Sequence, residues 1–199
     1  MTSVTLLLIK KNIILHMACN LTYGLALDCI DSIGGVAGSI YISSDADLGT
    51  LTLSSATGSV SLVTGATGET GTFYEFEVAK NVASFTETFN ISNENGTAFF
   101  EQALSLNLQK MEANKRNEIL LIARNRNLKV IFEDNNGKYW LMGYSRGAVV
   151  SAGTSVTGTA VGDLNGYTLT LTAQEPAMAY EVQGPIATTF GSCTFTAAP

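Results

Sequence analysis

The alternation of apolar and polar residues predicts β-strands along most of the chain. Between residues 84 and 91, Phe85, Phe89 and Ile91 alternate with Ser, Thr and Asn. The turn sequence NENG at 93–96 follows, and its Asn-Gly pair tolerates the positive φ that tight hairpins need. A long return strand is therefore predicted at 97–109. Further strands are predicted at 39–43, 50–54, 59–63, 72–78, 128–133, 138–144 and 167–173.

One segment between these strands has a different period. Met111, Ile119, Ile122 and Ala123 fall on one helical face, which predicts a helix over residues 112–126. Leu120 and Leu121 widen this apolar stripe, which is expected to face the core. The rest of its surface is basic: Lys115, Arg116, Arg124 and Arg126.

Composition favours a mainly β protein, a β-sandwich or β-barrel with one flanking α-helix. Charged residues make up only 14% of the 199 residues, and Ser, Thr, Asn and Gly are abundant. We expect an N-terminal extension at 1–16, one domain at 17–182 and a C-terminal tail at 183–199, with one more strand near 193–196. Residues 145–164 have almost no charge, and they are either a mobile loop or weak strands that a partner orders.

The first sixteen residues do not have the pattern of a secretory signal. Lys10 and Lys11 interrupt the apolar run, whereas a signal carries its positive charge before that run. The apolar segments are also too short to cross a bilayer, so we expect no membrane association. Met17 is the simplest natural start, with residues 1–16 as an upstream extension.

Charge is distributed unevenly along the chain. Residues 45–101 contain eight acids and one base, whereas residues 109–129 contain six bases and two acids. Three interpretations of the basic helix remain open: a solvated surface, a nucleic-acid contact, or a contact with the acidic surface of a neighbouring copy.

The sequence shows no motif of an enzyme or a cofactor site. The three cysteines lack the paired spacing of a zinc site, and the single histidine, His16, lies in the N-terminal extension. Glu75 and Glu77 share a strand face as a glycosidase pair would, yet acidic pairs on exposed strands are common. Residues 134–137 have calcium-loop composition, but a hairpin turn is the better interpretation. We therefore expect no enzymatic activity, no metal and no cofactor.

Three aromatic residues of the predicted strand at 138–144 are candidates for ligand stacking. Tyr139, Trp140 and Tyr144 are able to stack on bases or sugars when they are exposed. On a strand beside a helix, packing in the core is the expected role.

Several segments together resemble virion structural proteins of tailed phages and prophages of Bacteroidetes-type bacteria. They are RNEIL at 116–120, EDNNGKYWLMGY at 133–144 and GDLNGYTLTLTAQEP at 162–176, with MAC at 17–19 and DCIDSIGG at 28–35 as the beginning. The order of strands, helix, hairpin, long loop and strand is similar to the tail tube fold. The resemblance covers residues 17–182, and residues 1–16 depart from it.

The resemblance implies a tail tube subunit that forms hexameric, stacked rings in a virion made in the host cytoplasm. Other virion proteins would be its partners, and DNA would pass through the lumen without specific binding. We expect the helix and the 145–164 segment to contact neighbouring subunits, with Arg116, Arg124 and Arg126 meeting acids of the next copy. Alternatives are a neck, baseplate or capsid-decorating protein, or a secreted carbohydrate-binding β-sandwich.

Overall fold

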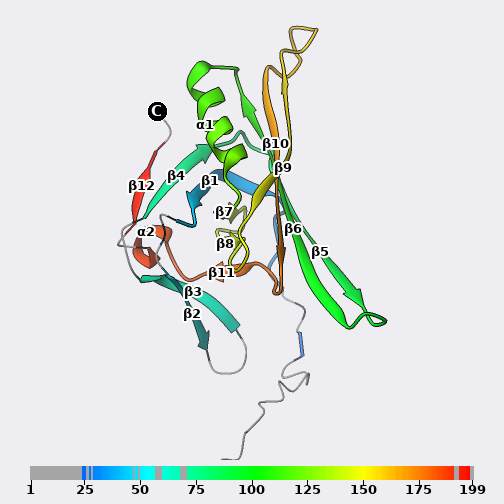
Figure 1. The fold of residues 1–199 in the computed structure, drawn as a ribbon, viewed down its shortest axis with the longest axis vertical. Coiled ribbons are helices and arrows are strands. Elements are labelled where there is room, and N and C mark those ends of the chain that lie inside the picture. The colour runs from blue at the N-terminus through cyan, green and yellow to red at the C-terminus, as the bar shows by residue number, and fades with distance from the viewer. Residues whose placement is uncertain are drawn as a thin grey trace, which may run out of the picture.

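The computed structural model describes residues 24–25, 27, 29–46, 48, 50–56, 60–67, 71–190 and 193–197. It has two β-sheets and one main helix (Figure 1), which confirms the predicted mainly β fold with a flanking helix. The strands are β1 (Val36–Ser44), β2 (Thr50–Ala56), β3 (Val60–Thr67), β4 (Thr72–Glu77), β5 (Ser84–Ser92), β6 (Thr97–Gln109), β7 (Leu128–Asp134), β8 (Tyr139–Met142), β9 (Val149–Val156), β10 (Gly166–Glu175), β11 (Tyr180–Val182) and β12 (Thr194–Thr196), and the helices are α1 (Ala113–Arg124) and α2 (Ile186–Thr189).

The larger sheet has eight strands in the order β12-β4-β1-β7-β8-β11-β3-β2, and the smaller sheet has four in the order β5-β6-β10-β9. Most neighbouring strands are antiparallel. The exceptions are β12 beside β4 and β11 beside β3, which are parallel pairs. Both exceptions involve strands from the end of the chain, so the C-terminal residues complete the larger sheet.

The smaller sheet is built from the strands with the clearest alternation in the sequence. β6 covers the 13 residues predicted for it, and β10 pairs with it along ten residue pairs. Leu104, Leu106 and Leu171 are fully buried. Because successive side chains of a strand point to opposite faces, the residues between these leucines face away from the core.

The main core lies between the two sheets. The smaller sheet contributes the leucines of β6 and β10, and the larger sheet contributes apolar residues of β1 and β7. Phe85 on β5 contacts Phe132 on β7 with ring centroids 4.6 Å apart. Burial of this apolar surface is the principal force that holds the two sheets together.

A second core lies on the other face of the larger sheet. Phe73, Ile131, Leu141 and Phe190 are fully buried there, although they come from three strands and from the residue after α2. Leu53 of β2 and Phe195 of β12 also pack against this cluster. Because β2 and β12 are the two edges of the sheet, the sheet must curl around this core, and Figure 1 shows α2 within the curl.

This second core changes the expectation for the C-terminus. Residues 183–199 were expected to form a tail, with one more strand near 193–196. In the described part of that segment, Ile186 and Phe190 are buried and β12 pairs with β4. The segment is apolar at the positions that fill the curled sheet, and burial of those side chains fixes it to the domain.

The structure also decides between the two alternatives for residues 145–164. Residues 149–156 form β9, which pairs with β10 from Val149 to Val156, so this part is a strand and no mobile loop. The expected extension at 1–16, the start at Met17 and Cys19 lie outside the described residues. Cys29 and Cys193 are free thiols.

Candidate functional site: an assembly surface

Helix α1 lies at the end of the sheets and is attached to them by few side chains. It covers residues 113–124 of the predicted 112–126, and only Ile122 on it is buried. Ile119 packs against the main core beside Ile122. Most other residues of the helix are exposed.

The first turn of α1 is fixed by a small ionic cluster. Glu112 forms ion pairs with Lys110 and Lys115, and the Lys115 Nζ also donates to the Gln109 carbonyl oxygen over 2.7 Å. The neighbouring Lys110 ammonium lowers the pKa of the Glu112 carboxyl below its ordinary value. All three side chains are solvated, so this cluster positions the start of the helix and contributes little to stability.

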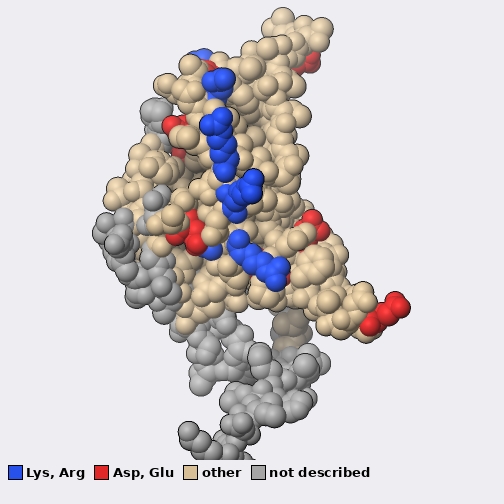
Figure 2. Space-filling model, in the orientation of Figure 1, with Lys and Arg blue, Asp and Glu red and all other residues tan. Residues whose placement is uncertain are grey.

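The three predicted contact residues are exposed and lack acidic partners. Arg116, Arg124 and Arg126 form none of the ion pairs found in the described part of the chain. Arg116 only approaches the side chain of Asn117, at 3.4 Å. Figure 2 shows that the Lys and Arg side chains gather in one stripe, which runs over α1 and continues down this face of the molecule.

Apolar side chains are exposed among these arginines. Leu121 is 61% exposed and Leu120 is 39% exposed, both on α1. On a helix, residues three and four apart are neighbours, so Leu120 lies between Arg116 and Arg124. Sequence reasoning assigned both leucines to a widened apolar stripe facing the core, whereas the structure turns them outward.

A second exposed apolar surface lies on the β5–β6 hairpin. The hairpin extends beyond the body of the molecule (Figure 1). Phe89 is 55% exposed and Ile91 is 68% exposed, and Phe89 contacts only its cross-strand partner Phe100, edge to face at 5.1 Å, among the ring pairs of the described chain. Alternation alone predicted these positions as half-buried.

The smaller sheet has two uncovered edges. β5 and β9 each pair with one strand, and neither has a second partner among the described strands. Residues 151–156 of β9 are all exposed. Unpaired N–H and C=O groups along such an edge are a template for pairing with another chain.

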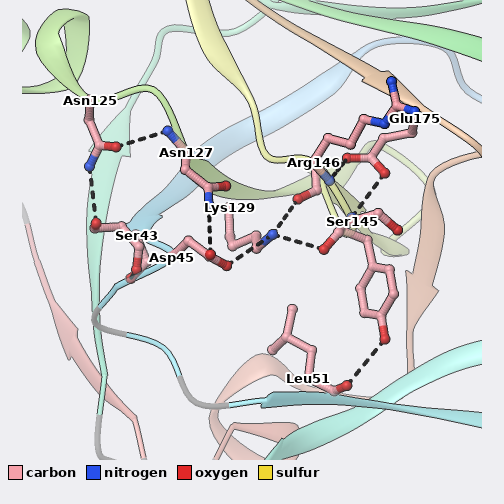
Figure 3. A network of polar contacts seen from close by, with 12 residues as sticks. Ser43, Asp45, Leu51, Asn125, Asn127, Lys129, Ser145, Arg146 and Glu175 are labelled. Atoms are coloured by element: carbon pink, nitrogen blue, oxygen red, sulfur yellow. Dashed lines mark hydrogen bonds and ion pairs between the residues drawn. The ribbon is translucent and has the colours of Figure 1, made fainter.

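Buried polar residues hold the connection between β8 and β9 in place (Figure 3). The Lys129 Nζ donates to the carbonyl oxygens of Gly143 and Tyr144, each over 2.8 Å, and forms an ion pair with Asp45 at 3.0 Å. The Glu175 carboxylate accepts from the backbone N–H groups of Ser145 and Arg146. This connection leads directly into β9, so these contacts fix the position of that edge strand.

Gln102 supports the same connection from the smaller sheet. Its Oε1 accepts from the Gly143 N–H at 3.1 Å, and its Nε2 donates to Glu87 and to the Ala177 carbonyl oxygen. Gln102 is almost fully buried. Sequence reasoning did not identify Gln102, Lys129 or Glu175. Gln102 and Glu175 occupy the otherwise apolar positions of β6 and β10, and this break in the alternation was the available signal.

The aromatic candidates for ligand stacking are mostly engaged within the protein. The Trp140 Nε1 donates to the Asp134 carboxylate at 3.2 Å, and the Tyr144 hydroxyl donates to the Leu51 carbonyl oxygen at 3.3 Å. Burial, together with the Glu133 carboxylate, raises the pKa of Tyr139 to about 12. These contacts are typical of packed aromatic residues with a satisfied polar end.

An open hollow of about 450 Å³ lies beside Trp140. Phe85, Phe132 and Met178 line it together with the Glu87 carboxylate. The Glu87 Oε1 accepts from both the Gln102 amide and the Ala179 N–H.

The other chemical candidates do not converge on a reactive centre. The Glu75 carboxylate accepts from the Tyr41 hydroxyl at 3.2 Å, and residues 134–137 form the turn between β7 and β8. Within the described residues, no group of three or more His, Cys, Asp or Glu side chains is placed to hold a metal ion. No helix in that part of the chain is long and apolar enough to cross a membrane.

Comparison with known proteins adds no relative. No protein-family model, no curated protein and no solved structure matches this chain.

Proposed function

We propose that this protein is a non-enzymatic structural subunit that assembles with copies of itself into rings, and that it serves as a tail tube subunit of a tailed-phage virion. The observation that carries the proposal is the smaller sheet, with β5 and β9 both uncovered at its edges. The edges of monomeric sheets are normally short, covered or protected by charge. β9 has no charged residue and no proline, and residues 151–156 are exposed.

The two uncovered edges belong to different strands, which favours a ring over a simple dimer. Pairing of β5 on one copy with β9 on the next joins two different surfaces. Such head-to-tail contacts form closed rings when the rotation closes and filaments when it does not. The resemblance to tail tube proteins, described above, leads us to propose hexameric rings that stack.

The outer face of the smaller sheet suits a channel for DNA. β5, β6, β9 and β10 contain no Lys or Arg. The face turned away from the core has Ser105 and Thr170 as a cross-strand pair, whose hydroxyl oxygens lie 3.4 Å apart. Because cationic contacts to phosphate dominate affinity for DNA, a lumen lined by this face would let DNA pass without binding it.

Lysines on β9 test whether this edge carries the assembly. In the double variant Thr154→Lys and Ser155→Lys, two charges sit on the exposed edge and oppose strand pairing. We expect the concentration at which half of the protein is assembled to rise by about tenfold or more, equivalent to about 1.4 kcal/mol. Mass photometry over a concentration series measures this shift.

The matched control places the same two charges away from the smaller sheet. Gln183→Lys and Ala187→Lys add equal charge at exposed positions beside and within α2. We expect this control to assemble close to the wild-type concentration. Equal assembly by the edge variant and the wild-type protein would exclude β9 as the contact.

The hollow beside Trp140 favours a second candidate, a carbohydrate-binding β-sandwich. Aromatic walls with a few polar groups are typical of such ligand sites. On this alternative the protein stays monomeric and Trp140→Ala abolishes binding in a glycan screen. Assembly into rings with no glycan binding would favour the tail tube proposal.

A further inference from the structure

We propose that α1 of one copy docks against the β5–β6 hairpin of a second copy. Leu120 and Leu121 would cover the exposed apolar face of the hairpin, and Arg124 and Arg126 would pair with its acids. The inference rests on the proposed self-assembly and names the partner surface within it.

The helix presents side chains that the described part of its own chain leaves exposed. Leu121 is 61% exposed, and Arg124 and Arg126 have no ion pair within the described residues. Exposed leucines flanked by unpaired arginines are typical of an interface, because interfaces combine an apolar centre with a polar rim. In water, the same leucines remain unfavourably exposed.

The hairpin presents a matching apolar face. Phe89 and Ile91 lie on the same side of β5 as Phe85, which packs in the main core. The side of the sheet that faces the core near Phe85 therefore extends along the projecting hairpin, where the larger sheet no longer covers its apolar residues. An isolated two-stranded hairpin is marginally stable in water, so this overhang gains stability when a second surface covers it.

The two surfaces have opposite charge. Residues 81–109, which include the hairpin, contain three acids and no base. Glu94 lies in the turn and Glu87 on the same side as Phe89, whereas Glu101 lies on the opposite side of the sheet. Residues 110–126 contain five bases and two acids, a net charge of +3. Glu94 is exposed in the hairpin turn, and Figure 2 shows acidic atoms at the projecting end of the molecule. Complementary potentials of this kind guide association and fix its register.

The contact must join different copies. Figure 1 shows α1 and the end of the β5–β6 hairpin at opposite ends of the smaller sheet. α1 instead contacts β9, the uncovered edge that the proposed function pairs with β5 of the next copy. Because the hairpin end and α1 lie at opposite ends of the sheet, a hairpin that reaches the α1 end of a second copy would form a head-to-tail contact.

Two charge-reversed variants test the inference. The helix variant is Arg124→Glu with Arg126→Glu, and the hairpin variant is Glu94→Arg with Asn95→Arg, both in the exposed turn. Each variant alone places like charges at the proposed contact, so its half-assembly concentration should rise at least about tenfold. An equimolar mixture restores opposite charges when the two variants alternate. The mixture should therefore assemble near the wild-type concentration.

Matched controls reverse charge elsewhere. Glu77→Arg alters the exposed last residue of β4 and Lys80→Glu an exposed residue between β4 and β5; neither residue belongs to the two surfaces, and both variants should assemble like the wild-type protein. Mass photometry gives the half-assembly concentrations, and circular dichroism confirms the fold of each variant.

The outcomes separate this inference from the proposed function. Suppose that the wild-type protein assembles. Unimpaired assembly of either variant alone would then overturn the helix–hairpin contact, and so would failure of the mixture to assemble. Both results would leave self-assembly intact. A wild-type protein that stays monomeric at every concentration would overturn both.

Discussion

Lys129 shows how one buried residue controls the placement of an edge strand. Its ammonium group is almost completely buried, and its three N–H donors meet two carbonyl oxygens and the Asp45 carboxylate. Lys129→Met keeps the volume of the side chain but leaves those acceptors without a donor. We expect the free energy of unfolding to fall by about 3 kcal/mol.

The control for Lys129 is an exposed lysine with a comparable ion pair. Lys138 pairs with Glu181 on the surface of the larger sheet, and Lys138→Met should cost less than about 1 kcal/mol. Urea unfolding monitored by Trp140 fluorescence measures both. Equal losses for the two variants would contradict the role assigned to Lys129.

At the scale of elements, Phe190 tests whether the C-terminal segment belongs to the fold. It is fully buried and contacts Phe73 edge to face, with ring centroids 5.4 Å apart. Phe190→Ala should destabilise the protein by about 3–5 kcal/mol, because it leaves a cavity in the second core. Urea unfolding measures the loss.

An exposed phenylalanine provides the comparison. Phe99 lies on the projecting hairpin and is 37% exposed, so Phe99→Ala should cost no more than about 1 kcal/mol in the monomer. An equally small loss of unfolding free energy for Phe190→Ala would mean that residues 183–199 contribute little to the fold, as expected of a tail.

The elements differ in how well their sequences predicted them. β5, β6 and β10 follow from strict alternation, and α1 follows from its change of period, because each pattern is local. β9 has weak alternation and β12 is short. They form strands because β9 pairs with the edge of β10 and β12 pairs with the edge of β4. Such long-range pairing leaves little trace in the strand's own residues.

The candidate site was predicted only in part. The basic residues of α1 were evident from their clustering, and the structure places Arg116, Arg124 and Arg126 on an exposed surface. The outward turn of Leu120 and Leu121 and the overhang of Phe89 and Ile91 were not evident. A sequence period identifies a face, but the length of the neighbouring elements decides whether that face is covered.

At the scale of the whole molecule, several surfaces of this protein are those expected of a subunit that contacts neighbouring copies. The smaller sheet has two open edges, a hairpin with uncovered apolar residues, and an outer face without Lys or Arg. A monomer would have to keep all of these surfaces in water. Assembly through the proposed head-to-tail contacts would cover the edges and the apolar residues, and would leave the face without Lys or Arg free to line a channel.

The most direct test of self-assembly is electron microscopy of the purified wild-type protein, with mass photometry over a range of concentration and salt. We predict closed rings, or tubes of stacked rings, whose lumen is lined by β5, β6, β9 and β10. High salt should weaken assembly, because screening reduces the attraction between the basic helix and the acidic hairpin. A protein that remains monomeric throughout this range would contradict the account.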